Sequence, residues 1–159
     1  MTEASSITSV LSTALRMKMD TPFHIDFDWW EHQRREYVFY MRSHLCEEHQ
    51  YKFVSEEDDD DQMLDWVDSR TGQVCRLDYL HYTLRIHCAI QPEFLTKRAS
   101  LVDAIFRLFI ANGNQPLTVT ELALRIGREG QEKTIFRTLA DESLSKGLRP
   151  VQSDSGTNV

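Results

Sequence analysis

The amino-acid sequence predicts an α+β protein, with an N-terminal helix and a small β-hairpin packed on a C-terminal helical module. Residues 26–49 contain no Gly or Pro and carry apolar side chains at helical spacing. Residues 62–77 alternate apolar and polar side chains around a turn that contains Gly72. Beyond Pro92, apolar residues recur at the i, i+3, i+4, i+7 and i+8 positions of a core-facing helix. The chain therefore combines helices with a short antiparallel sheet.

Length and composition indicate a soluble globular protein. A chain of 159 residues fits one ordinary domain or two small ones, and 41% hydrophobic with 27% charged residues is typical of globular proteins. No apolar run reaches the ~18 residues of a transmembrane helix, and the first residues lack a signal-peptide pattern. We therefore expect a cytoplasmic location and no membrane partner. The three cysteines include no CxxC pair, which predicts reduced thiols.

Charge is distributed unevenly along the chain. The net charge is −7, with 10 basic and 18 acidic side chains in residues 1–97. Residues 98–150 hold 8 basic and 6 acidic side chains. Because non-specific DNA binding depends on neutralising phosphates, any DNA contact is expected in the C-terminal third.

Composition and the pattern of apolar residues divide the chain into four regions. Residues 1–19 are predicted to be a flexible arm, 20–97 an N-terminal α+β subdomain, 98–151 a C-terminal subdomain, and 152–159 a disordered tail. No linker rich in Gly or Pro separates the two larger regions. The sequence leaves open whether they form one compact unit or two subdomains that share an interface.

The predicted N-terminal helix spans residues 26–49, with Asp26 or Asp28 as its N-cap. Its apolar stripe consists of Trp30, Tyr37, Val38, Met41 and Leu45. Three aromatic residues lie off this stripe, namely Trp29, Phe39 and Tyr40. Aromatic rings in such positions either pack internally or form a protein interface, which makes a homodimer or another protein partner a candidate.

The middle of the chain mixes strand and helix signals. Residues 51–55 predict a short strand, and the acidic run 56–61 predicts a solvated loop. Residues 62–77 predict the hairpin. Residues 78–90 fit either a strand or a helix capped by Asp78, and their few β-branched residues favour the helix.

The C-terminal third predicts three helices and an extended end. The first begins near residue 98, carries Leu101, Ala104, Ile105, Leu108 and Phe109 on one face, and ends at 112–114. Thr118 or Thr120 caps a second helix, and Gly127 and Gly130 bracket a turn. A third helix is expected over 131–143, followed by the extended segment 146–151.

Residues 98–151 resemble a winged-helix domain, in the succession of a helix, LTVTELALRIG, a turn, EKTIFRTLAD and SKGLRPV. The resemblance implies that the helix over 131–143 lies in the major groove of DNA. The residues expected to contact DNA are Arg128, Gln131, Lys133, Thr134, Arg137, Lys146 and Arg149. Glu132, Asp141 and Glu142 make the field of that helix nearly neutral, and the turn before it is long. Winged helices also bind proteins, so the fold alone leaves both functions open.

Cysteine and histidine side chains raise the question of zinc. Cys46 and His49 lie three residues apart and could share one ion on a helix. However, no CxxC knuckle is present, and the adjacent His87 and Cys88 point in different directions in a regular helix or strand. The favoured interpretation is therefore no metal and no cofactor, with zinc at Cys46 and His49 as the alternative.

No catalytic motif is recognisable, so the sequence predicts a protein that is not an enzyme. GREGQEKT, for example, lacks the glycine before Lys133 that a phosphate-binding loop requires. The leading hypothesis is a DNA-binding transcriptional regulator that uses its C-terminal winged helix. The alternative is an adaptor whose winged helix and acidic N-terminal face bind protein partners.

Overall fold

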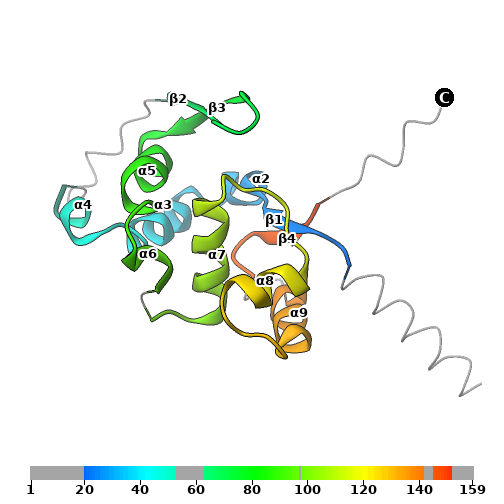
Figure 1. Ribbon diagram of the computed structural model, residues 1–159. Coiled ribbons are helices and arrows are strands. Elements are labelled where there is room, and N and C mark those ends of the chain that lie inside the picture. Colours follow the sequence, from blue (N-terminus) through cyan, green and yellow to red (C-terminus); the bar gives the residue numbers. More distant parts are fainter. Residues whose placement is uncertain (1–19, 53–62, 97, 142–144, 152–159) are drawn as a thin grey trace, which may run out of the picture.

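The computed structural model describes residues 20–52, 63–96, 98–141 and 145–151, and within them the chain is α+β as predicted (Figure 1). The strands are β1 (Phe23–Ile25), β2 (Met63–Val67), β3 (Val74–Asp78) and β4 (Leu148–Pro150). The helices of the N-terminal half are α2 (Phe27–Glu31), α3 (Arg34–Ser43), α4 (Glu47–Lys52), α5 (Tyr79–Thr83), the π-helix η2 (Leu84–Cys88) and α6 (Glu93–Thr96). Those of the C-terminal third are α7 (Leu101–Ala111), α8 (Val119–Arg125) and α9 (Glu132–Ala140).

The strands form two separate antiparallel pairs. In the predicted hairpin, Met63 of β2 lies opposite Asp78 of β3, which confirms that prediction. The second pair joins the two ends of the described chain, because Ile25 of β1 lies opposite Leu148 of β4. Phe23 of β1 also exchanges two backbone hydrogen bonds with Leu117, at 2.8 and 3.0 Å. A strand from the N-terminal segment therefore lies in the sheet of the C-terminal module.

The prediction of a single helix over 26–49 is wrong, because three helices occupy this segment. Asp26 caps α2 by accepting a hydrogen bond from the backbone N–H of Asp28, but α2 ends at Glu31. The ring of Trp30 lies 5.5 Å from the ring of Tyr40, centroid to centroid. Ten residues of a straight helix span roughly 15 Å along the axis, so this contact requires the chain to fold back between α2 and α3. Packing of the aromatic rings thus overrides a continuous helical pattern.

Two further boundaries differ from the prediction. Tyr51 and Lys52 end α4 instead of starting a strand, and the rest of that expected strand lies outside the described residues, as does the acidic run 56–61. The last long helix, α9, ends at Ala140 with Asp141 as its C-cap, short of the expected residue 143. The expected arm 1–19 and tail 152–159 also lie outside the described residues.

The predicted caps at Thr118 and Asp78 are confirmed, and Ser100 forms a further cap. Ser100 and Thr118 cap α7 and α8, each accepting a backbone hydrogen bond through its side chain. Asp78 caps α5 in the same way, so the ambiguous segment 78–90 is helical. Its second half is the π-helix η2, in which the N–H of Ala89 donates to the C=O of Leu84 at 2.7 Å.

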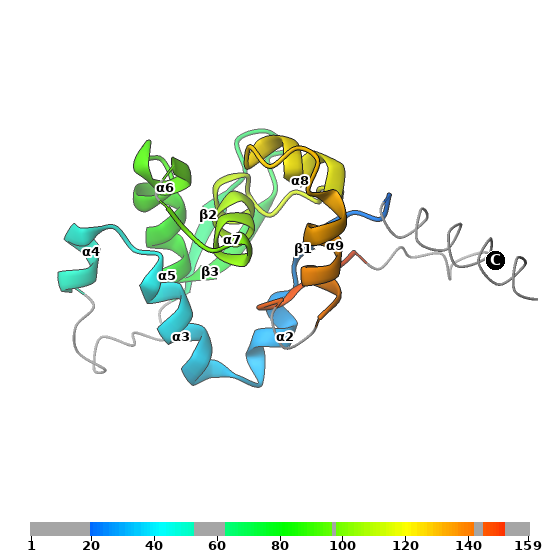
Figure 2. The ribbon, with the colours of Figure 1, turned by 90° about the horizontal axis from the view of Figure 1, so that it is seen from below.

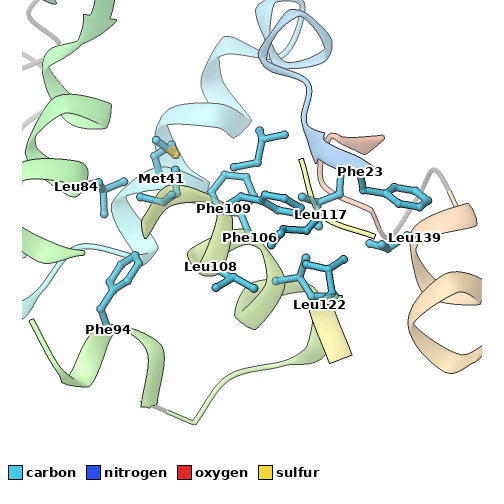
Figure 3. Packing of buried hydrophobic residues seen from close by; sticks show 14 of the residues in the cluster. Phe23, Met41, Leu84, Phe94, Phe106, Leu108, Phe109, Leu117, Leu122 and Leu139 are labelled. Carbon is cyan, nitrogen blue, oxygen red and sulfur yellow. The ribbon is translucent and has the colours of Figure 1, made fainter. Parts of the chain in front are cut away.

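One hydrophobic core joins both halves of the chain, with α7 at its centre (Figure 3). Ile105, Phe106 and Phe109 of α7 are fully buried. In Figure 3, Met41 and Leu84 from the N-terminal half lie on one side of this helix, and Leu122 and Leu139 of α8 and α9 lie on the other. Among the described residues, no helix is long and apolar enough to cross a membrane.

Candidate functional site

Helices α8 and α9 are joined by a turn and contact each other, and α9 contacts α7. Leu122 and Ala123 of α8, and Ile135 and Leu139 of α9, are the buried faces of the two helices. The turn between them is closed by backbone hydrogen bonds from Arg128 N–H to Ala123 C=O at 2.8 Å and from Gln131 N–H to Arg128 C=O at 3.1 Å. Ala123 is fully buried where α8 contacts α9, and the face of α9 opposite Ile135 and Leu139 is turned outward.

The outward face of α9 carries four of the residues predicted to contact DNA. Lys133, Thr134 and Arg137 are exposed and lie within one turn of each other, and Gln131 is exposed at the start of the helix. Glu132 is half-buried, and its Oε1 accepts a hydrogen bond from the N–H of Gly130 at 3.1 Å. This carboxylate is therefore directed into the turn and away from Lys133 and Arg137.

The other three predicted DNA contacts are placed differently. Arg128 is half-buried in the turn before α9. Lys146 is exposed, and its Nζ lies 5.5 Å from the ring centroid of Tyr40 on α3. Arg149 is half-buried on β4, opposite His24 of β1. The structure thus brings four of the seven residues together on α9 and disperses the rest around its edges.

Of the three aromatic residues predicted to form a partner interface, only Phe39 has an exposed side chain. Trp29 packs edge-on against the buried Trp30 at 4.7 Å and lies partly buried at the margin of the core. The hydroxyl of Tyr40 donates a hydrogen bond of 2.6 Å to Oδ1 of Asp103. Phe39 is 78% exposed and lines a groove of about 960 Å³ between α3 and the start of α7. Trp29 and Tyr40 are partly buried and engaged within the chain, so Phe39 is the one exposed ring of the three that supports the homodimer and partner predictions.

A compact group of four metal-ligand side chains lies at the other end of the molecule, where α4 meets η2. Cys46, His49, His87 and Cys88 each offer one ligand atom, and the four atoms lie within 4.8 Å of one another. The Sγ atom of Cys46 lies 3.1 Å from Nδ1 of His49, 3.6 Å from Nδ1 of His87 and 3.5 Å from Sγ of Cys88. The Sγ atom of Cys88 lies 3.8 Å from Nδ1 of His49. We refer to these four residues as the Cys–His cluster.

Sequence reasoning selected Cys46 and His49 but missed the other two members of the cluster. His87 and Cys88 are neighbours, and regular helix geometry separates their directions. The π-helix η2 has a wider turn, and in it both side chains reach the same cluster. The second cysteine–histidine pair in the sequence is the signal that could have found them. However, the two side chains reach the same cluster only in a π-helix, and no sequence pattern predicts that π-helix.

The environment of the Cys–His cluster is partly closed to solvent. Cys88 is buried, and burial, with a smaller contribution from Cys46, raises the pKa of its thiol to about 12. The backbone N–H of Cys46 donates to Sγ of Cys88 at 3.4 Å. On the outer side, Nε2 of His87 lies 3.7 Å from Oε2 of Glu48, and Nε2 of Gln91 lies 3.3 Å from Nδ1 of His87.

Two buried histidines, His44 and His81, and the third cysteine, Cys75, lie outside this cluster. His44 is buried and accepts a hydrogen bond from Nε of Arg107 at 3.0 Å, and burial followed by the charge of Arg107 lowers its pKa to about 4. His81 is buried against Phe27, with ring centroids 4.6 Å apart. Cys75 is exposed on β3. None of these three residues belongs to the Cys–His cluster.

Comparison of the chain with protein-family models, with curated proteins and with solved structures finds no match in any of the three.

Proposed function

We propose that this protein binds double-stranded DNA through its helix-turn-helix, with α9 as the helix that enters the major groove. The observation that carries the proposal is the sorting of charge on α9. Lys133 and Arg137 are exposed on its outer face, whereas the carboxylate of Glu132, the residue before Lys133, accepts a hydrogen bond within the turn. An outward face with two cations and no carboxylate between them is suited to phosphates and base edges.

The dimensions and position of α9 support the proposal. An α-helix with its side chains is about 10–12 Å across and therefore fits a major groove about 12 Å wide, and the nine residues of α9 extend roughly 13 Å along that groove. Arg137 and Lys133 have the side chains that contact phosphates or guanine, and Gln131 and Thr134 can form hydrogen bonds with bases. Figure 2 shows α9 at one edge of the molecule, where a duplex could approach it.

The strand arrangement adds support to the winged-helix resemblance, with one departure. Leu117 pairs with β1, and β1 pairs with β4, so a small sheet lies beside the helix-turn-helix. Its middle strand comes from residues 23–25, far from the module in sequence. We propose that this N-terminal strand replaces a strand that the winged-helix pattern takes from within the module.

The test is fluorescence anisotropy of a labelled random-sequence duplex, titrated with protein at low and at moderate salt. We expect salt-dependent binding that the double variant Lys133→Ala, Arg137→Ala weakens about tenfold or more, with a salt slope reduced by about two. The matched control is Arg35→Ala, Arg76→Ala, which removes the same charge from exposed positions on α3 and β3. This control should retain the wild-type slope.

Two outcomes would count against DNA binding. If the wild-type protein does not bind at low salt, α9 makes no phosphate contacts and the protein adaptor becomes the leading hypothesis. If both double variants weaken binding equally, the effect is one of net charge and not of α9. In either case Phe39, the exposed aromatic beside the groove between α3 and α7, is the first residue to substitute in a search for protein partners.

A further inference from the structure

The ligand atoms of the Cys–His cluster have the spacing of a tetrahedral zinc site. Bond lengths of roughly 2.3 Å for Zn–S and 2.05 Å for Zn–N give tetrahedral edges of about 3.8 Å between two sulfurs and about 3.6 Å between sulfur and nitrogen. The distance between Sγ of Cys46 and Sγ of Cys88 is 3.5 Å, and the three sulfur–nitrogen distances are 3.1, 3.6 and 3.8 Å. Each of these four distances differs from the ideal edge by half an ångström or less, and the two distances from the other ring nitrogens and sulfur are no longer than 4.8 Å, so side-chain rotations of about an ångström would close the site around an ion.

The donor set selects zinc among the common cations. Two thiolates and two imidazoles are the ligands of structural zinc, whereas magnesium and calcium require oxygen ligands. Two thiolates also neutralise the charge of Zn²⁺, which compensates for placing the buried Cys88 in its ionised form. Four protein ligands leave no open coordination position, which is the arrangement of a structural and not a catalytic site.

Groups around the Cys–His cluster match the outer partners that zinc ligands have. Because Nδ1 of His87 faces Cys46, its Nε2 is directed outward, 3.7 Å from the carboxylate of Glu48. A carboxylate on the second ring nitrogen fixes the tautomer and orientation of a ligating histidine. The N–H of Cys46 donates to Sγ of Cys88, which stabilises a thiolate. Gln91, 3.3 Å from Nδ1 of His87, has to turn away when that nitrogen binds metal.

Helix α4 has six residues, too few for an isolated helix to be stable, and none of the side chains of residues 47–51, the ones whose burial is described, is buried. Tyr51, its one aromatic residue, is 82% exposed. Hydrophobic packing therefore does not explain why α4 lies against η2, whereas a shared ion does.

We propose that Cys46, His49, His87 and Cys88 bind one Zn²⁺ ion, which fastens α4 and the end of α3 to the π-helix η2. The ion closes a loop of more than forty residues between Cys46 and Cys88. Figure 2 shows α4 and α9 at opposite ends of the molecule, so this site is independent of DNA binding by α9.

The first test is metal content and coordination of the full chain. Protein purified under reducing conditions should contain one zinc per chain by elemental analysis. After removal of zinc by a chelator, Co²⁺ alone should give the visible absorption of tetrahedral cobalt together with a thiolate-to-cobalt charge-transfer band, and Zn²⁺ should abolish both. An octahedral cobalt spectrum, or one without the thiolate band, would overturn the proposal.

Matched variants locate the site. Cys88→Ser and His87→Asn should lose the tetrahedral cobalt spectrum, whereas Cys75→Ser and His32→Asn, which change exposed residues of the same types, should retain it. Glu48→Gln should bind Zn²⁺ about tenfold more weakly with an unchanged cobalt spectrum, because it alters only the outer partner of His87. Equal cobalt binding by Cys88→Ser and the wild-type protein would show that the cluster is not the site.

A measurement on the wild-type protein keeps the proposal testable if the variants fail to fold. With Zn²⁺ bound, alkylation followed by mass spectrometry should modify Cys75 but protect Cys46 and Cys88, and a chelator should expose both. Hydrogen exchange should accelerate in residues 47–52 on chelation and remain unchanged in α9. Alkylation of all three cysteines in the presence of Zn²⁺ would reject the site.

Discussion

The side-chain amide of Asn114 pairs with both backbone polar groups of Ile25, as a neighbouring strand would. Its Oδ1 accepts a hydrogen bond from the Ile25 N–H at 2.8 Å, and its Nδ2 donates to the Ile25 C=O at 2.9 Å. Ile25 is fully buried, so these groups have no access to water. Asn114 also has a positive φ of 61°, which asparagine tolerates better than most residues. One side chain thus completes the hydrogen bonding of β1 and links it to the end of α7.

Replacing Asn114 should destabilise the fold in two separable ways. Asn114→Ala removes both hydrogen bonds and places a β-carbon in a left-handed conformation, for a loss of about 3 kcal/mol. Asn114→Gly keeps the conformation accessible and loses only the hydrogen bonds, about 2 kcal/mol. Urea unfolding monitored by circular dichroism measures both. A loss below about 0.5 kcal/mol for Asn114→Ala would mean that Ile25 finds other partners.

Gly147 is predicted to be the glycine least tolerant of a side chain. A β-carbon there would lie 2.7 Å from Nε1 of Trp30 and 3.1 Å from Cε3 of Trp29, and φ is 78°. Gly127 has a similar φ of 70° but open space around it, which makes it the matched control. We expect about 1 kcal/mol of backbone strain for Gly127→Ala, and at least about 2 kcal/mol more for Gly147→Ala because the buried Trp30 has to move. Urea unfolding followed by tryptophan fluorescence checks the difference, and equal losses for the two variants would contradict it.

Elements with complete local signals were predictable from the sequence. The stripe that includes Leu101, Ile105 and Phe109, the cap at Thr118 and the turn around Gly72 each depend on a few neighbouring residues, and each prediction is confirmed. These features depend on backbone and side-chain chemistry within one or two turns of chain.

Elements created by distant contacts were not predictable. Strand β1 has three residues and pairs with β4 from the other end of the chain, so no local pattern marks it. The breaks around α3 depend on the contact of Trp30 with Tyr40, which exists only in the folded molecule. Half of the Cys–His cluster was missed for the same reason, since a regular helix would separate His87 from Cys88 and only η2 brings them together.

Tyr37 and Asp78 form a cross-link whose removal should be costly. The Tyr37 hydroxyl donates a 2.6 Å hydrogen bond to Oδ2 of Asp78, while Oδ1 of the same carboxylate accepts from the His81 N–H at 2.7 Å and caps α5. Tyr37→Phe should lose about 1.5–3 kcal/mol, the range for a hydrogen bond to a charged group. Asp78→Ala should lose about 1 kcal/mol more, because the cap is removed as well.

The free energies of unfolding of Tyr37→Phe and Asp78→Ala, measured by chemical unfolding, distinguish the contribution of the Tyr37–Asp78 hydrogen bond from that of the helix cap. Asp78→Asn retains an oxygen for either the cap or the tyrosine and is expected to lie between the wild-type protein and Asp78→Ala. If Tyr37→Phe and Asp78→Ala have the same stability, the cap of α5 contributes nothing measurable and only the cross-link matters.

The buried imidazole of His81 should make the stability of the protein depend on pH. Burial, followed by the charge of Arg85, lowers its pKa well below the usual 6.5. In the unfolded chain His81 binds a proton as the pH falls through 6.5, whereas in the folded protein it stays neutral, so stability is lost as the pH falls below 6.5. Between pH 7.5 and pH 5.5 this one residue should lower the free energy of unfolding by about 1.4 kcal/mol. His81→Phe retains a ring against Phe27 but cannot titrate, so its free energy of unfolding should fall by that much less over the same interval.

The measurement is urea unfolding at both pH values with a chelator present, so that protonation of the Cys–His cluster does not release metal and add to the slope. Identical pH dependence in the wild-type protein and His81→Phe would show that the imidazole is charged in the folded protein, and that Arg85 and the surrounding core do not keep it neutral.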